Sequence, residues 1–280
     1  MALRTQIASR SEADRPRRFL AGGVFPPLAL GLIALAWVSL LAWEASPYGR
    51  YLHHGDWTTL GLAGAICTAL PAGNIVLPAL FYVGGWSLMT TAMMLPTALP
   101  LIRLFDRMIT ANRQRQALHT LLIAGYLLAW GGFGLLAHAL DAGLHAGLAR
   151  ADWLAAHAWI PGAAVLGLAG GFQFSRLKYR CLDACRSPFA FINRYWRGPY
   201  PRCEAFQLGL AHGLYCVGCC WALMLLMFVI GTGSVGWMLL LGLVMAIEKN
   251  HPWGRHLAKP LGAALLSGAA LIIALHGNGA

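Results

Sequence analysis

The sequence has few charged residues and very few acidic ones. Only 11% of its 280 residues are charged, with 21 Lys and Arg against 10 Asp and Glu. By contrast, 58% of the residues are hydrophobic and the mean hydropathy is +0.60. A typical soluble domain carries about 25% charged residues. This composition therefore excludes an ordinary soluble domain and indicates a multi-spanning membrane protein.

Other absences narrow the function and the fold further. The sequence contains no Gly-x4-Gly-Lys-Ser/Thr loop and no soluble segment large enough for a nucleotide, which argues against ATP-driven pumping. The apolar stretches are long and do not alternate with polar residues, which argues against transmembrane strands. Helices are the remaining way to satisfy the backbone in lipid.

We expect an all-α, polytopic transmembrane bundle of about seven spans, because about 30 Å of hydrocarbon requires roughly 20 apolar residues. Six spans is the alternative count, since the fourth and sixth stretches are short or broken. The predicted spans lie near residues 22–43, 78–102, 118–140, 158–175, 206–230, 232–248 and 257–276. The predicted organisation is a disordered basic tail at 1–21 and one transmembrane domain at 22–280, with a Cys-containing cytoplasmic loop at 176–204.

The basic residues predict the orientation. With seven spans, every Lys and Arg except Arg50 and Arg150 falls on one side, which should be the cytoplasm. The amino terminus is then cytoplasmic, and we expect a multi-pass protein of a bacterial inner membrane. Because topology explains the basic charge, we expect the lipid bilayer rather than nucleic acid as partner.

Soft metal ligands gather in the predicted spans. On one helix, His212, Cys216, Cys219 and Cys220 share an arc of about 100°. Two further spans carry methionines at a similar depth, and Pro96 loosens one of them by freeing a backbone carbonyl. These methionines are Met89, Met93, Met94, Met238 and Met245.

Thiol and thioether donors together select Cu(I), while Zn(II) uses Cys and His but has little use for Met. A lone buried thiolate is costly in lipid, and Cu(I) would neutralise it. Simple packing is the alternative for any one of these residues. Cys181, Cys185 and Cys203 are candidates for a secondary site or relay. Glu248 and Lys249 are expected to be an interfacial pair at a helix end.

Four separated motifs resemble the bacterial family described as predicted metal-binding integral membrane proteins. They are the Met-rich segment from Trp86 to Pro96, "LKYRCLDACRSP", "HGLYCVGCCWALM" and "GWMLLLGLVMAIEKNHPWG". The resemblance implies metal binding in a membrane, with copper handling. It carries over onto Met89, Met93, Met94, Cys181, Cys185, Cys216, Cys219, Cys220, Glu248 and Lys249.

The leading hypothesis is a protein that binds Cu(I) for transfer, transport or maturation of a copper enzyme, with a copper chaperone or copper enzyme as partner. The alternative is a thiol-disulfide oxidoreductase that uses Cys216 and Cys219. Depth in the membrane argues against this enzyme, because exchange partners could not reach the thiols. A haem site at His138 and His276 is a weaker option, since the sequence offers no clear second haem ligand at matching depth.

Overall fold

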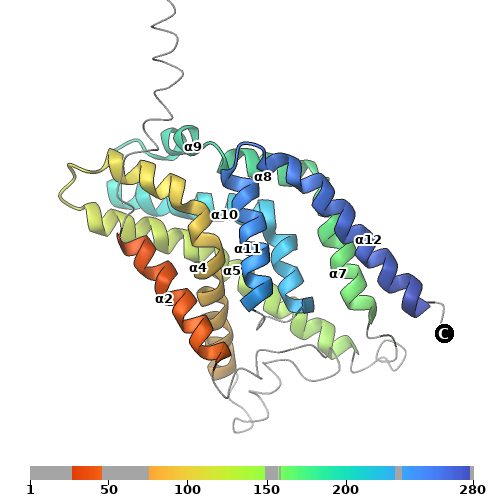
Figure 1. Cartoon of the computed structure of the whole chain (residues 1–280). Coiled ribbons are helices and arrows are strands. Elements are labelled where there is room, and N and C mark those ends of the chain that lie inside the picture. Colours follow the sequence, from red (N-terminus) through yellow and green to blue (C-terminus); the bar gives the residue numbers. More distant parts are fainter. Residues whose placement is uncertain (1–26, 46–75, 149–156, 158, 231–234, 278–280) are drawn as a thin grey trace, which may run out of the picture.

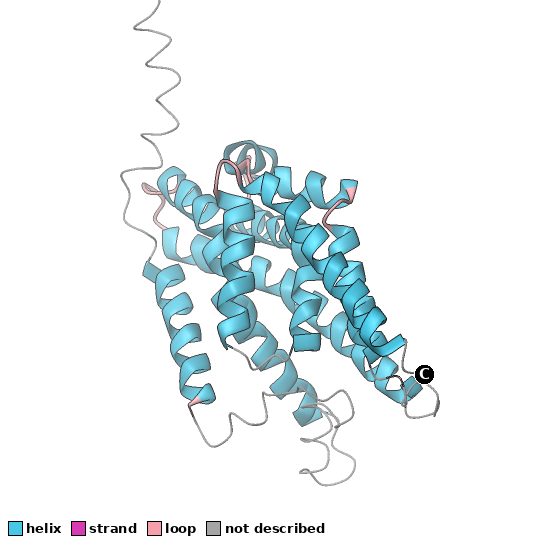
Figure 2. Cartoon of the chain, turned by 45° about the vertical axis from the view of Figure 1, so that its right-hand side comes forward, coloured by secondary structure: helices cyan, strands magenta, loops and turns pink. Residues whose placement is uncertain are grey.

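The computed structural model describes residues 27–45, 76–148, 157, 159–230 and 235–277. Within these ranges every regular element is helical (Figure 2), which confirms the predicted all-α class. The elements are α2 (Pro27–Glu44), α4 (Val76–Met108), α5 (Arg115–Leu148), α7 (Trp159–Phe172), α8 (Arg176–Cys185), α9 (Pro188–Tyr195), α10 (Pro201–Ile230), α11 (Val235–Asn250), the 3-10 turn η2 (Gly254–Leu257) and α12 (Ala258–Gly277).

Seven of these helices fall where spans were predicted, but only five are long and apolar enough to cross a membrane. The two shorter ones are α7 with 14 residues and α11 with 16. The seven-span count and the orientation therefore stay predictions. The predicted basic tail lies outside the described residues, and so does Cys67, one of the seven cysteines of the sequence.

Helices α10 and α4 form the centre of the bundle. α10 packs against α5, α7 and α8, while α4 packs against α5, α11 and α2, and α12 pairs with α7 (Figure 1). The short helices α8 and α9 lie at one end of the bundle, on the connection between α7 and α10. The α8 and α9 segment, predicted as a loop, is thus largely helical.

Glycines allow α5 and α10 to approach closely. A Cβ atom at Gly125 would meet the carbonyl oxygen of Phe206, and one at Gly209 would meet the carbonyl oxygen of Leu122. Small residues at a helix contact let the two backbones touch, which is how helices associate where no hydrophobic force drives them together. This contact fixes α10, and with it the thiols that α10 carries.

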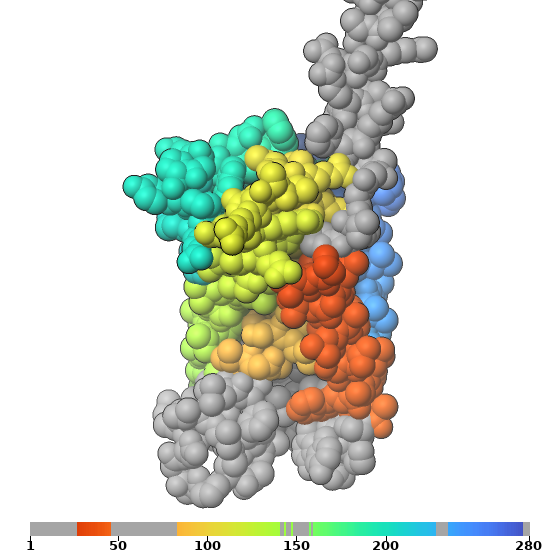
Figure 3. All heavy atoms as spheres, turned by 90° about the vertical axis from the view of Figure 1, so that its left-hand side faces the viewer, coloured from red at the N-terminus to blue at the C-terminus, as the bar shows by residue number. Residues whose placement is uncertain are grey.

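The outer faces of the bundle are apolar. Only 17% of the apolar window of α2 is buried, and the same share holds for α12. Large side chains such as Leu35 and Val38 of α2 are more than half exposed. Figure 3 shows α2 lying lengthwise on the surface of the molecule. Several polar side chains are instead buried, among them Lys178, Glu204, His212, Glu248 and Lys249. This inverted distribution suits a solvent of lipid.

Replacing Gly209 with alanine should destabilise the protein by about 1–3 kcal/mol, since the new methyl group overpacks a backbone contact. Gly132→Ala is the matched control, because a Cβ at Gly132 has no neighbour within 4 Å. Alanine also favours helix over glycine, so this control should be neutral or stabilising. Thermal unfolding of the purified variants in one detergent measures both. Equal stability of the two variants would contradict the close packing of α5 and α10.

Candidate metal centre

Helix α10 carries three buried thiols on its inner side. Cys216, Cys219 and Cys220 are each 1% exposed. The thiols of Cys219 and Cys220 lie 3.1 and 2.8 Å from the carbonyl oxygen of Cys216 and donate to it. A thiol is a weak donor, and these local bonds satisfy it without help from another helix. The thiols of Cys219 and Cys220 therefore do not require hydrogen bonds to water.

Two further helices bring groups to these thiols. The sulfur of Met94 on α4 lies 3.8 Å from Sγ of Cys220. The ammonium of Lys249 on α11 lies 2.8 Å from Sγ of Cys216, 3.7 Å from Sγ of Cys220 and 3.9 Å from Sδ of Met94. We call Met94, Cys216 and Cys220 the sulfur cluster. Its three soft donors surround one cationic group.

The backbone next to Met94 is held by polar side chains. The hydroxyls of Thr97 and Tyr126 donate to the Met94 carbonyl over 2.7 and 3.0 Å. The Tyr126 oxygen also lies 3.0 Å from Sγ of Cys216. Pro96 and Pro100 remove two N–H donors from this part of α4, so two of the helix's own hydrogen bonds are missing next to the site. Tyr126 thus links α4, α5 and α10 at the sulfur cluster.

Helix α8 adds two thiols from the end of the bundle. Gly218 of α10 makes room for Cys181, whose Sγ lies 2.6 Å from where a Cβ at Gly218 would be. A hydrogen bond with Cys219 raises the pKa of Cys185 well above its usual value, and burial adds to the shift. Burial raises the pKa of Cys181, as does the nearby Cys219. Both shifts favour the protonated form of the α8 thiols.

A buried ion pair fixes α8 to α11. Nζ of Lys178 lies 2.9 and 2.8 Å from the two carboxylate oxygens of Glu248, and it also bonds to Gln173. Arg186, just after α8, donates over 2.5 Å to the carbonyl of Glu248. Lys178 is fully buried and Glu248 is 2% exposed, so each charge depends on the other.

The expectation that Glu248 and Lys249 form an interfacial pair is wrong. Both side chains are buried, and they point to different partners: Glu248 to Lys178, and Lys249 to the sulfur cluster. Consecutive residues on a helix are about 100° apart, so neighbouring charges reach different sides. Each side chain binds a partner inside the bundle, although the sequence pattern predicted that both would reach water.

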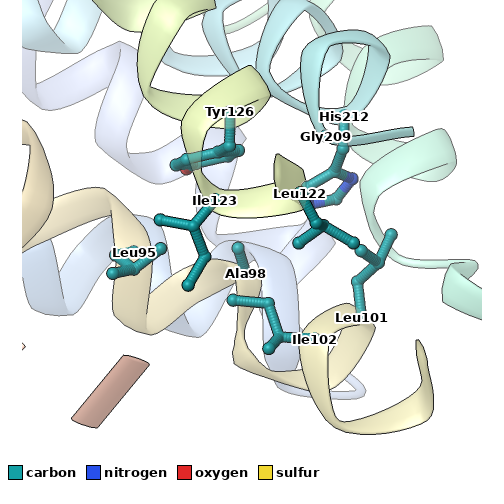
Figure 4. A pocket seen from close by; sticks show the side chains of 9 residues that line it. All are labelled: Leu95, Ala98, Leu101, Ile102, Leu122, Ile123, Tyr126, Gly209 and His212. Atoms are coloured by element: carbon teal, nitrogen blue, oxygen red, sulfur yellow. The ribbon is translucent and has the colours of Figure 1, made fainter. Parts of the chain in front are cut away.

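His212 lies beside the sulfur cluster among aromatic rings. Its ring stacks on Tyr126 with centroids 5.9 Å apart and meets Phe191 edge-on at 5.3 Å. Figure 4 shows His212 and Tyr126 lining a small apolar pocket with Leu95, Leu122 and other side chains. Its Nδ1 is buried and has no hydrogen-bond partner among the described residues. Helical periodicity placed His212 on the same face as the thiols, but in the structure its ring stacks on Tyr126.

The other predicted ligands are distributed around this centre. The side chain of Met93 lies 3.8 Å from where a Cβ at Gly242 of α11 would be, so it packs between α4 and α11. Cys203 is exposed. Three further predicted ligands are buried outside the sulfur cluster: Met89, Met238 and Met245. Within the described ranges, no three His, Cys, Asp or Glu side chains are arranged to hold a metal by themselves. The sulfur cluster instead includes the thioether of Met94 among its three donors.

One protein family matches this chain over most of its length. The model of the family described as PpoB2, a copper chaperone, matches residues 83–272. The chain belongs to the PpoB2 copper chaperone family. The matched range includes α4, α8, α10 and α11, and so all of the sulfur cluster. No curated protein and no solved structure matched the chain.

Membership of the PpoB2 family supports the expected copper-related function and the copper-related family that the resemblance indicated. It does not favour the thiol-disulfide alternative. The six cysteines in the described part of the chain are all free.

Two residues of the centre were not predicted from the sequence, and the role of a third was misread. Tyr126 lies on α5, which carries no Cys or Met, so nothing marked it. Lys178 was counted as one of many basic residues of a loop. Lys249 was noticed, but its role was misread. The useful signal was the adjacent pair Glu248 and Lys249 next to a long apolar run, because charges in such a segment are expensive and so need partners.

Glu248→Gln should cost roughly 3–5 kcal/mol of stability, because it leaves the Lys178 ammonium buried without a counter-charge. The matched control is Asp183→Asn, which breaks the 3.5 Å pair with Arg255. Both members of that pair are about half exposed, so its loss should cost about 1 kcal/mol or less. Thermal unfolding compares the two variants. A Glu248→Gln protein as stable as the control would show that the buried pair does not hold α8 in place.

Proposed function

We propose that this chain is an integral membrane copper chaperone that binds Cu(I) at the sulfur cluster and hands the ion to a copper enzyme or another chaperone. The observation that carries the proposal is the meeting of Met94, Cys216 and Cys220, from two helices, around the ammonium of Lys249. Two thiolates with a thioether form a donor set that suits a soft ion. Zn(II) is the less suited ion, since it rarely uses Met.

The separation of the donors suits a single ion. Sγ of Cys220 and Sδ of Met94 are 3.8 Å apart, so both can contact an ion at roughly the 2.3 Å of a metal–thiolate bond. The ion would balance one of the two thiolate charges in a site that excludes water. Met93 packs against α11 nearby, and with Met89, Met238 and Met245 it supplies further thioethers for a passing ion.

We propose a route for the ion through the thiols of α8. Cys185 is half-buried and hydrogen-bonds Cys219, which lies one helical turn from Cys216. Cys181 contacts α10 at Gly218. Copper could therefore move between α8 and the sulfur cluster by exchanging one thiolate for the next. Exposed Cys203, at the start of α10, is a candidate for the first contact with a partner.

The membrane location rests on the five long apolar helices and on the apolar exterior of the bundle. We propose that α7 and α11 also cross, which gives seven spans. The amino terminus is then cytoplasmic and the α8 and α9 segment lies on the cytoplasmic side, because basic residues favour that side. In a bacterium the membrane is the inner one, and the cytoplasm keeps the α8 thiols reduced.

Copper content tests the metal proposal. Purified under reducing conditions and loaded with Cu(I), the Cys216→Ser and Cys220→Ser variants should lose most of the copper that the wild-type chain holds, since each removes a thiolate donor. Cys203→Ser is the matched control and should keep its copper, because Cys203 is exposed and outside the cluster. Copper per chain is measured after dialysis. If Cys216→Ser and Cys220→Ser both hold as much copper as the wild type, copper does not bind at the sulfur cluster.

Labelling of Cys203 tests the orientation. In a Cys67→Ser background, a membrane-impermeant maleimide should label Cys203 in inside-out vesicles at least about tenfold faster than in right-side-out cells, because α10 would begin on the cytoplasmic side. Adding Cys203→Ser should abolish the signal, since the other described thiols are buried or half-buried. Faster labelling from the outer face would reverse the proposed topology.

A further inference from the structure

Lys249 places its ammonium group within the sulfur cluster. Its ammonium lies 2.8 Å from Sγ of Cys216 and 3.2 Å from the hydroxyl of Thr97, with Cys220 and Met94 within 3.9 Å. The side chain is 5% exposed. Burying a cation in this way is costly unless negative charge or strong acceptors surround it. Within the described chain, the ammonium is within 4 Å of three sulfur atoms and the hydroxyl of Thr97, and it also interacts electrostatically with Tyr126.

The neighbouring carboxylate does not neutralise Lys249. Both oxygens of Glu248 are taken by Lys178, at 2.9 and 2.8 Å. The two charges of that pair cancel each other. The charge of Lys249 is therefore left for whatever the sulfur cluster holds.

Charge balance then distinguishes ions of different valence. Two thiolates, from Cys216 and Cys220, with one monovalent ion carry a net charge of minus one, and the Lys249 ammonium brings the total to zero. With a divalent ion the same groups carry plus one. Opposite or like charges about 4 Å apart interact strongly even at an effective dielectric constant of about 20, so a buried site favours the neutral total.

On this basis we propose that Lys249 is the specificity-determining residue of the centre: its fixed charge selects a monovalent soft ion over a divalent one. This inference rests on the proposed function, since it assigns a role at the same site. Softness of the donors alone does not separate Cu(I) from soft divalent ions such as Cd(II), because both accept thiolates. The ammonium of Lys249 distinguishes the monovalent ion from the divalent one by charge.

The experiment compares ions that are both soft but differ in charge. Full-length protein in detergent is titrated with Ag(I), as a stable stand-in for Cu(I), and with Cd(II), each against a competing chelator. In the wild type, Ag(I) should bind tightly and Cd(II) weakly. Lys249→Gln should shift the ratio of the two affinities toward Cd(II) by about a hundredfold or more, because the site with Cd(II) is then neutral and the site with Ag(I) is not.

Two control variants separate charge from shape. Lys249→Arg keeps the positive charge and should keep the preference for Ag(I). Lys259→Gln removes an exposed lysine at the start of α12 and should leave both affinities unchanged. If Lys249→Gln does not fold, Lys249→Met retains an unbranched side chain without charge, and it should shift the ratio in the same direction.

The outcomes distinguish this inference from the proposed function. If the wild type binds Ag(I) and the Cys216→Ser variant does not, but neutral residues at position 249 leave the affinity ratio unchanged, only the role of Lys249 is overturned. If the wild type binds neither ion, or if Cys216→Ser and Cys220→Ser bind as the wild type does, the copper proposal fails and this inference fails with it.

Discussion

The buried charges at the carboxyl end of α11 determine how the helices around the metal centre are arranged. Lys178 is paired with Glu248, while Lys249 faces thiols. In a bundle with an apolar exterior, an unmatched charge would be far more costly than in water. The two contacts meet at the carboxyl end of α11, and together they connect α11 to α8, α10 and α4. The position of the sulfur cluster depends on this arrangement.

The glycines of α10 allow neighbouring helices to come close to the sulfur cluster. Gly209 lets α10 approach α5, which brings Tyr126 to Cys216. Gly218 lets Cys181 of α8 reach α10 on another side. Because side chains are absent at these points, thiols and hydroxyls can come from neighbouring helices without a gap. Larger residues at these positions would hold Cys216 apart from Tyr126 and Cys181 apart from α10.

Much of the fold could be predicted from sequence. The stretches around α4, α5 and α10 are long and apolar, and their approximate positions follow from hydropathy alone. The soft donors of α10 and α4 could also be grouped, since helical periodicity places Cys216 and Cys220 on one face. What periodicity could not supply is the rotation of each helix against its neighbours. That is why His212, on the same arc, turned out to face Tyr126.

The sequence by itself determined an all-helical chain with an apolar exterior and a supply of thiols, thioethers and scarce charges, because composition and hydrophobic length are local properties. Only the tertiary structure decided which of these groups meet. It put the ammonium of Lys249 among Met94, Cys216 and Cys220, although Lys249 and Met94 are 155 residues apart. Contacts across such separations depend on how helices pack and turn, and neither is encoded in the spacing of residues along a single helix.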